Sequence, residues 1–338
     1  MNRKILLFPF LCLQTIICFA QDNDVKTLRE EARTFLQQGE YDNALQLLEK
    51  ARAQQPDNLD VLKDEVFTYY YKRDYAKALE IGKTIIARDD ADAESFQLLG
   101  MVYKAVADYK EGDKIYKAAL KKFPKSGVLY SEYGDLLQSS DNKSGAIKLW
   151  EKGIEVDPNI SGNYYYASKY YAKNGNIIWG LLYAELFINI ESLTKRTTEI
   201  KAQLFNGYKK LFENRNDIAA LKTSDSPFGN AVAETFSRLT EVMKNEPAPE
   251  TITALRTRFI LDWYAHNTKK FRFRLFDYQR QLLQDGYFDA YNQWIFGEAA
   301  SEDKYSIWVY THDEDMQAFQ KLQHTLLFKV PAGQYYEH

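Results

Sequence analysis

The amino-acid sequence predicts an all-α protein, with paired helices repeating along the first half and an irregular helical domain in the second. The main observation is an evenly spaced internal repeat without insertion or deletion, whose five units open at Val25, Leu59, Ala93, Gly127 and Ser161. With 338 residues, 45% of them hydrophobic and 27% charged, the chain is long and apolar enough to bury a sizeable core. Its 44 basic and 47 acidic residues nearly balance, which argues against a nucleic-acid partner.

The first twenty residues have the layout of a secretory signal. A short basic start precedes an apolar run over 5–13, and Ala20 offers a small residue before a cleavage point. We expect cleavage after 1–20 and a periplasmic or secreted chain with no stable membrane insertion; the alternative is an uncleaved signal anchor. Cleavage removes Cys12 and Cys18, so the mature chain has no disulfide and no thiol chemistry.

Each repeat unit reads as two helices of about a dozen residues joined by a short polar turn. We expect the hairpins to close near Gly39, Arg73, Ala107, Asp141 and Gly175. Small residues recur where two helices must approach closely. At the eighth position of the units stand Ala32, Val66, Gly100, Gly134 and Ser168, and at the twentieth Ala44, Ala78, Gly112, Ala146 and Gly180. The eleventh position holds a large filler in every unit, namely Phe35, Tyr69, Tyr103, Leu137 and Tyr171.

A period of about 34 residues with small and large side chains at these positions resembles the tetratricopeptide repeat family. The segment over 38–58, QGEYDNALQLLEKARAQQPDN, is close to a consensus unit of that family. The resemblance covers about half of the chain, and the fifth unit departs from it at Phe187 and Ser192. It implies that the units stack into a right-handed helical solenoid with a concave inner face.

The resemblance also indicates which side chains line the concave face, where an extended peptide or amphipathic helix would bind. The expected partner-binding groove contains Arg29, Arg33, Lys63, Phe67, Tyr70, Gln97, Met101, Lys104, Asp135, Tyr165 and Lys169. Some family members hold a peptide carboxylate with Lys and Asn at two of these positions, but Asn is missing here. Alternatively, these residues are solvated or are covered by the second half of the chain.

The second half is helical by its apolar periodicity but does not repeat. We expect a helix over 195–212 that caps the array, a loop over 222–229, and further helices over 231–243, 251–264, 275–283, 287–296 and 314–328. The predicted organisation is therefore a signal over 1–20, a repeat array with its capping helix over 21–215, and a smaller helical domain over 216–338. The apolar end of the fifth unit predicts that the second half packs against it.

Basic and aromatic residues alternate in the second half and could bind a glycan or another anionic polymer. This alternative ligand cluster consists of Trp263, His266, Lys269, Arg272, Arg274 and Trp294. The competing interpretation is an aromatic core whose basic ends are solvated.

The sequence contains no motif that indicates catalysis, metal binding or a cofactor. It has no nucleophile elbow, no phosphate-binding loop and no zinc-protease motif. Its four histidines are not spaced as metal ligands would be. We therefore expect a non-catalytic, exported interaction scaffold that binds a protein or peptide partner. The alternative is an envelope protein that binds a glycan or anionic polymer through the second half.

Overall fold

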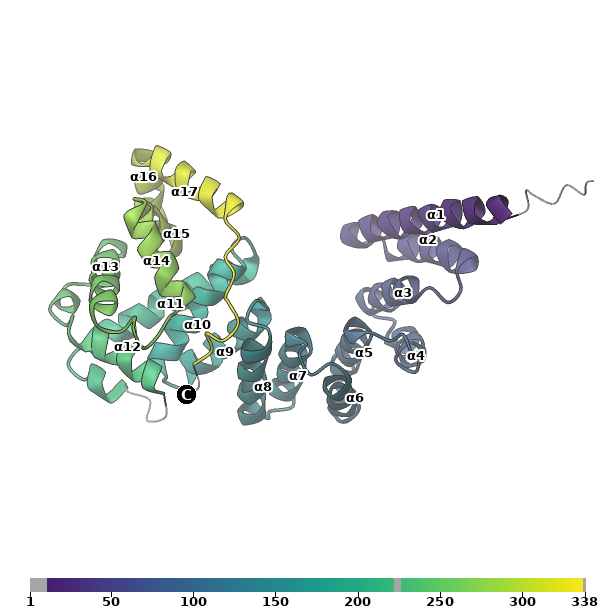
Figure 1. Ribbon diagram of the computed structural model, residues 1–338, viewed down its shortest axis with the longest axis horizontal. Helices are drawn as coiled ribbons and strands as arrows, with labels where there is room; N and C mark the ends of the chain where they lie inside the picture. Colours follow the sequence, from purple (N-terminus) through teal and green to yellow (C-terminus); the bar gives the residue numbers. More distant parts are fainter. Residues whose placement is uncertain (1–10, 222–225, 337–338) are drawn as a thin grey trace, which may run out of the picture. The chain divides into compact units, whose positions relative to one another are not determined.

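The computed structural model describes residues 11–221 and 226–336, with the backbone alone at 11–23 and 219–220. The predicted signal over 1–20 therefore lies outside the residues whose side chains are described. All regular structure within the described ranges is helical (Figure 1). The chain forms two compact units. The first consists of the residues up to 124 together with the short segment 139–141, and the second consists of 125–138 and the residues from 142 onward.

The first unit is built from helix hairpins in the predicted register. Its helices are α1 (Leu11–Gln38), α2 (Tyr41–Gln54), α3 (Leu59–Lys72), α4 (Tyr75–Ile86), α5 (Ala93–Ala105) and α6 (Tyr109–Lys122). Helices α3 and α5 begin at the predicted first residues of their repeats.

The second unit begins with further helices in the repeat register, and the helices after them no longer follow it. Its repeating helices are α7 (Gly127–Ser139), α8 (Lys143–Val156), α9 (Ser161–Lys173), α10 (Ile177–Ile190) and α11 (Lys195–Glu213). The remaining helices are η1 (Ile218–Leu221), α12 (Pro227–Ser237), η2 (Val242–Lys244), α13 (Pro249–His266), α14 (Arg274–Gln284), α15 (Phe288–Ala300), α16 (Glu302–Thr311) and α17 (Asp313–Thr325).

All five predicted hairpin turns are confirmed by their backbone conformation. Gly39, Arg73, Ala107, Asp141 and Gly175 have φ angles of 81°, 66°, 58°, 63° and 83°. A left-handed residue ends the first helix of a hairpin and turns the chain sharply enough for the second helix to pack back on it. The next residue begins the new helix: Asp74, Asp108, Asn142 and Asn176 each accept a hydrogen bond from a backbone N–H three residues ahead.

The small residues of the repeat lie where the helices of one hairpin touch. A Cβ atom at Gly134 would lie 2.2 Å from Nε1 of Trp150, and one at Gly100 would lie 2.2 Å from the ring of Tyr116. Trp150 and Tyr116 are themselves fully buried and occupy the same position in successive repeats. In the third and fourth repeats the eighth position is therefore glycine, because a large aromatic ring of the second helix fills the space beside it.

Helix α11 follows the repeat register beyond the fifth repeat. It begins one full period after Ser161, carries Ala202 at the eighth position and places Phe205 at the eleventh. It packs against α10 and α9, as the first helix of a sixth repeat would. The predicted capping helix thus corresponds to the first helix of a sixth repeat, and its other face packs on α15.

One hydrophobic core runs through the second unit, from Ala146 on α8 to Val330 near the C-terminus. Helix α10 lies at its centre, with every residue from Ile178 to Ile188 buried. The prediction that the second half packs on the end of the repeats is confirmed. The predicted boundary at 216 marks the end of the repeating pattern, whereas the compact units divide after 124.

The helix boundaries of the second half differ from the predicted ones in places. Helix α12 begins inside the predicted 222–229 loop, because Ser226 accepts a hydrogen bond from the Gly229 N–H and Pro227 suits the first helical turn. The sequence pattern does not predict α16, which buries no residue and so has no apolar stripe to reveal it. After α17 the chain returns toward α9, where Val330 and Asn159 exchange two hydrogen bonds of 2.9 and 3.1 Å (Figure 1).

Candidate functional site

The cationic end of the predicted groove, formed by Arg29, Arg33 and Lys63, is paired with carboxylates of the chain itself. Arg29 binds Asp64 at 2.7 Å and Asp60 at 3.0 Å, and Arg33 binds Asp64 at 2.9 Å. Lys63 is buried, and its ammonium lies 2.6 to 3.0 Å from Asp60, Asp92 and Glu94. Three cations thus face four carboxylates.

The ionisable side chains of this network are stabilised in their charged forms. Burial disfavours the ammonium form of Lys63, but hydrogen bonds to the surrounding carboxylates outweigh that effect and raise its pKa. At Asp60, contacts with Lys63 and Arg29 together outweigh burial and lower the pKa of its carboxyl. The positive charge at the cationic end of the predicted groove is therefore balanced by carboxylates of the chain itself.

The apolar groove residues of the first unit are half-buried. The ring of Phe67 lies 4.8 Å from that of Tyr71, and Tyr70 contacts both Tyr71 at 5.4 Å and Tyr75 at 6.0 Å. Gln97, Met101 and Lys104 on α5 are also half-buried. The structure thus brings Phe67 and Tyr70 into one aromatic cluster and leaves part of it accessible.

In the second unit the predicted groove residues meet α11. Tyr165 on α9 is buried and donates its hydroxyl to Glu199 at 2.7 Å, while Lys169 binds Glu199 at 2.6 Å. The ammonium of Lys169 also lies 4.7 Å above the ring of Tyr165. Hydrogen bonds from Lys169 and Tyr165 lower the pKa of Glu199. Asp135 on α7 is half-buried, and its charge adds to burial in raising the pKa of Tyr166.

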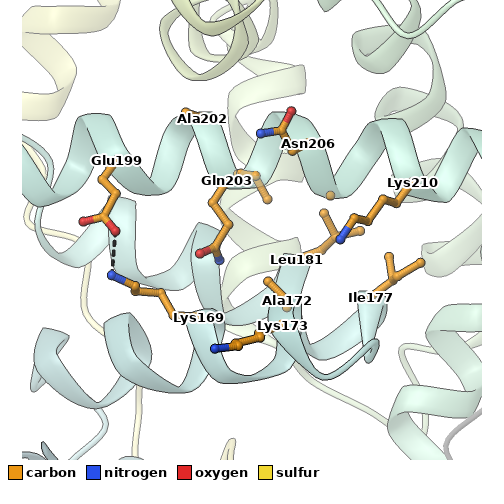
Figure 2. Close-up of a pocket in the computed structure, with 13 residues that line it drawn as sticks. Lys169, Ala172, Lys173, Ile177, Leu181, Glu199, Ala202, Gln203, Asn206 and Lys210 are labelled. Atoms are coloured by element: carbon orange, nitrogen blue, oxygen red, sulfur yellow. Dashed lines mark hydrogen bonds and ion pairs between the residues drawn. The ribbon is translucent and has the colours of Figure 1, made fainter. Parts of the chain in front are cut away.

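A pocket of about 540 Å³ opens beside this contact, between α9, α10 and α11 (Figure 2). Its volume falls within the range of about 300–1,000 Å³ that is typical of small-molecule sites. The residues lining it are Lys169, Ala172, Lys173, Ile177, Gly180, Leu181, Glu199, Ala202, Gln203, Leu204, Asn206, Gly207 and Lys210. We refer to this site as the α9–α11 pocket.

The α9–α11 pocket combines an apolar floor with polar side chains on its walls. Leu181 and Ile177 from α10 lie between α9 and α11, and Gln203 points from α11 toward α9 (Figure 2). The Nε2 atom of Gln203 is shielded from solvent and has no hydrogen-bond partner among the described residues. Lys173 on α9 and Lys210 on α11 form no ion pair within the described part of the chain.

Of the residues that line this pocket, the repeat pattern places Lys169 and Ala172 on the concave face, and Lys169 belongs to the predicted groove. It does not single out Gln203 and Lys210, because it identifies 195–212 as a cap outside the repeat register, nor Lys173, which follows the last concave position of its helix. Continuing the repeat count by one more period from Ser161 places Glu199 and Gln203 at the concave positions of a sixth repeat.

The alternative ligand cluster of the second half does not form an exposed aromatic surface. Trp263 and Trp294 are buried in the core with 1% and 8% of their surface exposed. Lys269, Arg272 and His266 are exposed, and Arg274 lies over the ring of Phe328 at 5.2 Å. The structure therefore supports the competing interpretation, in which the aromatic rings pack inward and the basic ends are solvated.

Within residues 11–221 and 226–336, no group of three or more His, Cys, Asp or Glu side chains is arranged to hold a metal ion. No helix in the same ranges has the length and apolar character needed to cross a membrane.

Stacked hairpins with an evenly spaced register and a concave pocket define a helical-repeat protein of the interaction-scaffold class. A family model described as tetratricopeptide repeat matches residues 35–102. This match confirms, over those residues, the tetratricopeptide-repeat resemblance that the sequence predicts.

Known proteins resemble parts of the chain. Tetratricopeptide repeat protein 21B of Homo sapiens is 31% identical over 134 residues, which are 39% of this chain and 10% of the human protein. This chain thus spans only a tenth of the length of that curated relative. Among solved structures, a thermophilic tetratricopeptide-repeat protein of Thermus thermophilus is 17% identical, with a TM-score of 0.47, over 53% of this chain and 98% of that one. A tetratricopeptide-repeat protein of Parabacteroides merdae is 15% identical, with a TM-score of 0.41, over 77% and 98% of the two chains.

Proposed function

We propose that this protein is an exported, non-catalytic scaffold that binds a segment of a protein partner, and that the α9–α11 pocket is the site where that segment is anchored. The observation that carries the proposal is the pocket itself, which has an apolar floor and a volume of about 540 Å³. Export rests on the signal-like pattern over 1–20.

The arrangement suits an anchored peptide for a physical reason. An apolar side chain that enters the pocket leaves water and gains contact with Leu181, Ile177 and Leu204, which is the main source of affinity at peptide-binding sites. Polar groups on the walls then satisfy the backbone or side chains of the bound segment. In the first unit, by contrast, the cations at the end of the groove already bind carboxylates of the chain itself.

The test is peptide selection on the full chain, followed by substitution. A displayed random-peptide library is sorted on the wild-type protein, and the affinity of the selected peptides is measured by fluorescence anisotropy. Gln203→Trp places an indole in the pocket and should weaken binding at least tenfold. Thr198→Trp adds the same bulk to an exposed position of α11 that does not line the pocket, and should leave the affinity unchanged.

Circular dichroism and thermal melting establish that both variants fold. Selected peptides that bind folded Gln203→Trp as tightly as the wild type would place the binding site elsewhere and refute the proposal. A library that yields no binding peptide would also refute it.

A further inference from the structure

The charge balance of the α9–α11 pocket differs from that of the groove residues in the first unit. Lys169 is satisfied, since it binds Glu199 at 2.6 Å and donates to the Tyr165 hydroxyl at 3.0 Å. Lys173 and Lys210 line the same pocket without a carboxylate partner among the described residues. The pocket is therefore lined by three lysines and one glutamate, and the charges of Lys173 and Lys210 are not balanced by a carboxylate of the lining.

The two unpaired cations come from different walls. Lys173 lies on α9 and Lys210 on α11, with the floor residues Ile177 and Leu181 between the two helices (Figure 2). A segment lying along this floor would pass both ammonium groups. Lysine attracts an anion as a compact charge with rotatable donors, so it tolerates a range of carboxylate positions.

Gln203 adds a donor to the same space. Its Nε2 atom is buried and unpartnered among the described residues, which costs free energy in the unbound protein. Because Gln203 points into the pocket, a rotation of its amide would let it donate to an oxygen brought by a ligand (Figure 2). These three side chains, Lys173, Lys210 and Gln203, all favour an acceptor or an anion.

From these observations we infer that the α9–α11 pocket selects a partner segment in which an apolar side chain is flanked by Asp or Glu. The inference rests on the proposed function and specifies the chemistry of its ligand. The apolar side chain occupies the floor, and side-chain carboxylates pair with Lys173 and Lys210. Ion pairs of this kind weaken in salt, so the preference should fall as ionic strength rises.

The experiment uses three labelled nonapeptides, all acetylated and amidated so that no terminal charge contributes. One alternates Leu with Glu, the second replaces every Glu by Gln, and the third replaces every Glu by Lys. Binding to the full chain is measured by fluorescence anisotropy at low and high salt. We expect the acidic peptide to bind at least tenfold more tightly than the glutamine peptide at low salt, and the lysine peptide to bind more weakly than both.

Matched variants assign the preference to the pocket. Lys173→Met with Lys210→Met should abolish the difference between the acidic and glutamine peptides. Lys148→Met with Lys195→Met removes the same charge from exposed positions outside the pocket and should retain the difference.

The outcomes separate this inference from the proposed function. Equal binding of the acidic and glutamine peptides, with both lost in Gln203→Trp, would overturn the ligand chemistry and leave the pocket as a peptide site. A preference that survives in the Lys173→Met and Lys210→Met double variant would also overturn it. Binding of all three peptides that is unaffected by Gln203→Trp, or no binding at all, would refute both.

Discussion

Arg256 on α13 donates from Nη2 to Oε1 of Glu185 on α10, and the two side chains are only 2% and 4% exposed. Glu185 also accepts hydrogen bonds from Gln279 at 2.6 Å and from Tyr291 at 2.8 Å. The guanidinium lies over four aromatic rings, with that of Phe296 at 5.3 Å. This ion pair joins the last helix of the fifth repeat to the helices that follow the repeats.

Removing one partner of this pair should destabilise the second unit strongly, because the other charge stays buried without compensation. We expect Arg256→Met to lower the free energy of unfolding by about 3–5 kcal/mol. Adding Glu185→Met should recover part of that loss, and urea denaturation of the two variants measures the difference. A double variant no more stable than Arg256→Met alone would show that the buried charge is not the cause.

A chain truncated after residue 215 should not behave as an independent array. The core that continues from Ala146 to Val330 would be cut, exposing the faces of α10 and α11 that pack on α12 and α15. We expect the fragment to melt earlier than the full chain and to aggregate, as followed by circular dichroism and size-exclusion chromatography. A monomeric fragment with an unchanged melting temperature would contradict the packing role of the second half.

The space beside Gly134 should not accept a methyl group. A Cβ atom added at this position would lie 2.2 Å from the Trp150 ring nitrogen, so Gly134→Ala forces the indole or the helix to move. Overpacking of this kind costs about 1–3 kcal/mol, measured as a shift in the urea midpoint. Combined with Trp150→Leu, the same substitution should cost less than the sum of the two single changes. Strict additivity would indicate that the two residues do not compete for space.

Acid should weaken the first unit through its carboxylate network. Burial works against the charged forms of Asp60 and Asp92. Contacts with Lys63, joined by Arg29 at Asp60 and by Ser95 at Asp92, outweigh it and lower both pKa values. Groups with a lowered pKa stabilise the fold above the pKa of the unfolded chain, and this contribution is lost as pH falls through the folded value. Thermal stability should therefore fall below about pH 4. Lys63→Met should show a shallower dependence on pH, and parallel curves would contradict the assignment.

Lys201 should give the opposite dependence on pH in the second unit. Its ammonium lies 3.7 Å from the ring of Trp294, and burial lowers the pKa of Lys201 to about 7. The unfolded chain then binds one more proton between about pH 7 and pH 10, so stability from this group rises with pH over that range. Lys201→Met should be more stable than the wild type at pH 7 and lack this rise. Urea denaturation at several pH values from neutral to alkaline gives the free energy of unfolding of the wild type and of Lys201→Met. Identical slopes of this free energy against pH would contradict the lowered pKa.

The repeat architecture could be predicted from the chain alone because its determinants are local and periodic. Left-handed turns such as those at Gly39 and Gly175, small residues at the eighth and twentieth positions, and helix caps such as Asp74 and Asn142 recur at a fixed spacing. Each acts between residues of one hairpin or its neighbour. The same local pattern therefore occurs in the sequence once per repeat, which makes it recognisable without the structure.

The candidate site depended on contacts that this periodicity does not encode. Only the folded chain shows that Arg29 and Lys63 are neutralised by the next hairpin, whereas Lys173 and Lys210 face a pocket without a counter-ion among the described residues. Trp263 is of a type suited to a ligand site but packs in the core, because its neighbours come from helices with no repeating register. Charge pairing and burial depend on which distant side chains arrive at the same place, and that is settled by tertiary packing rather than by the spacing of residues along one helix.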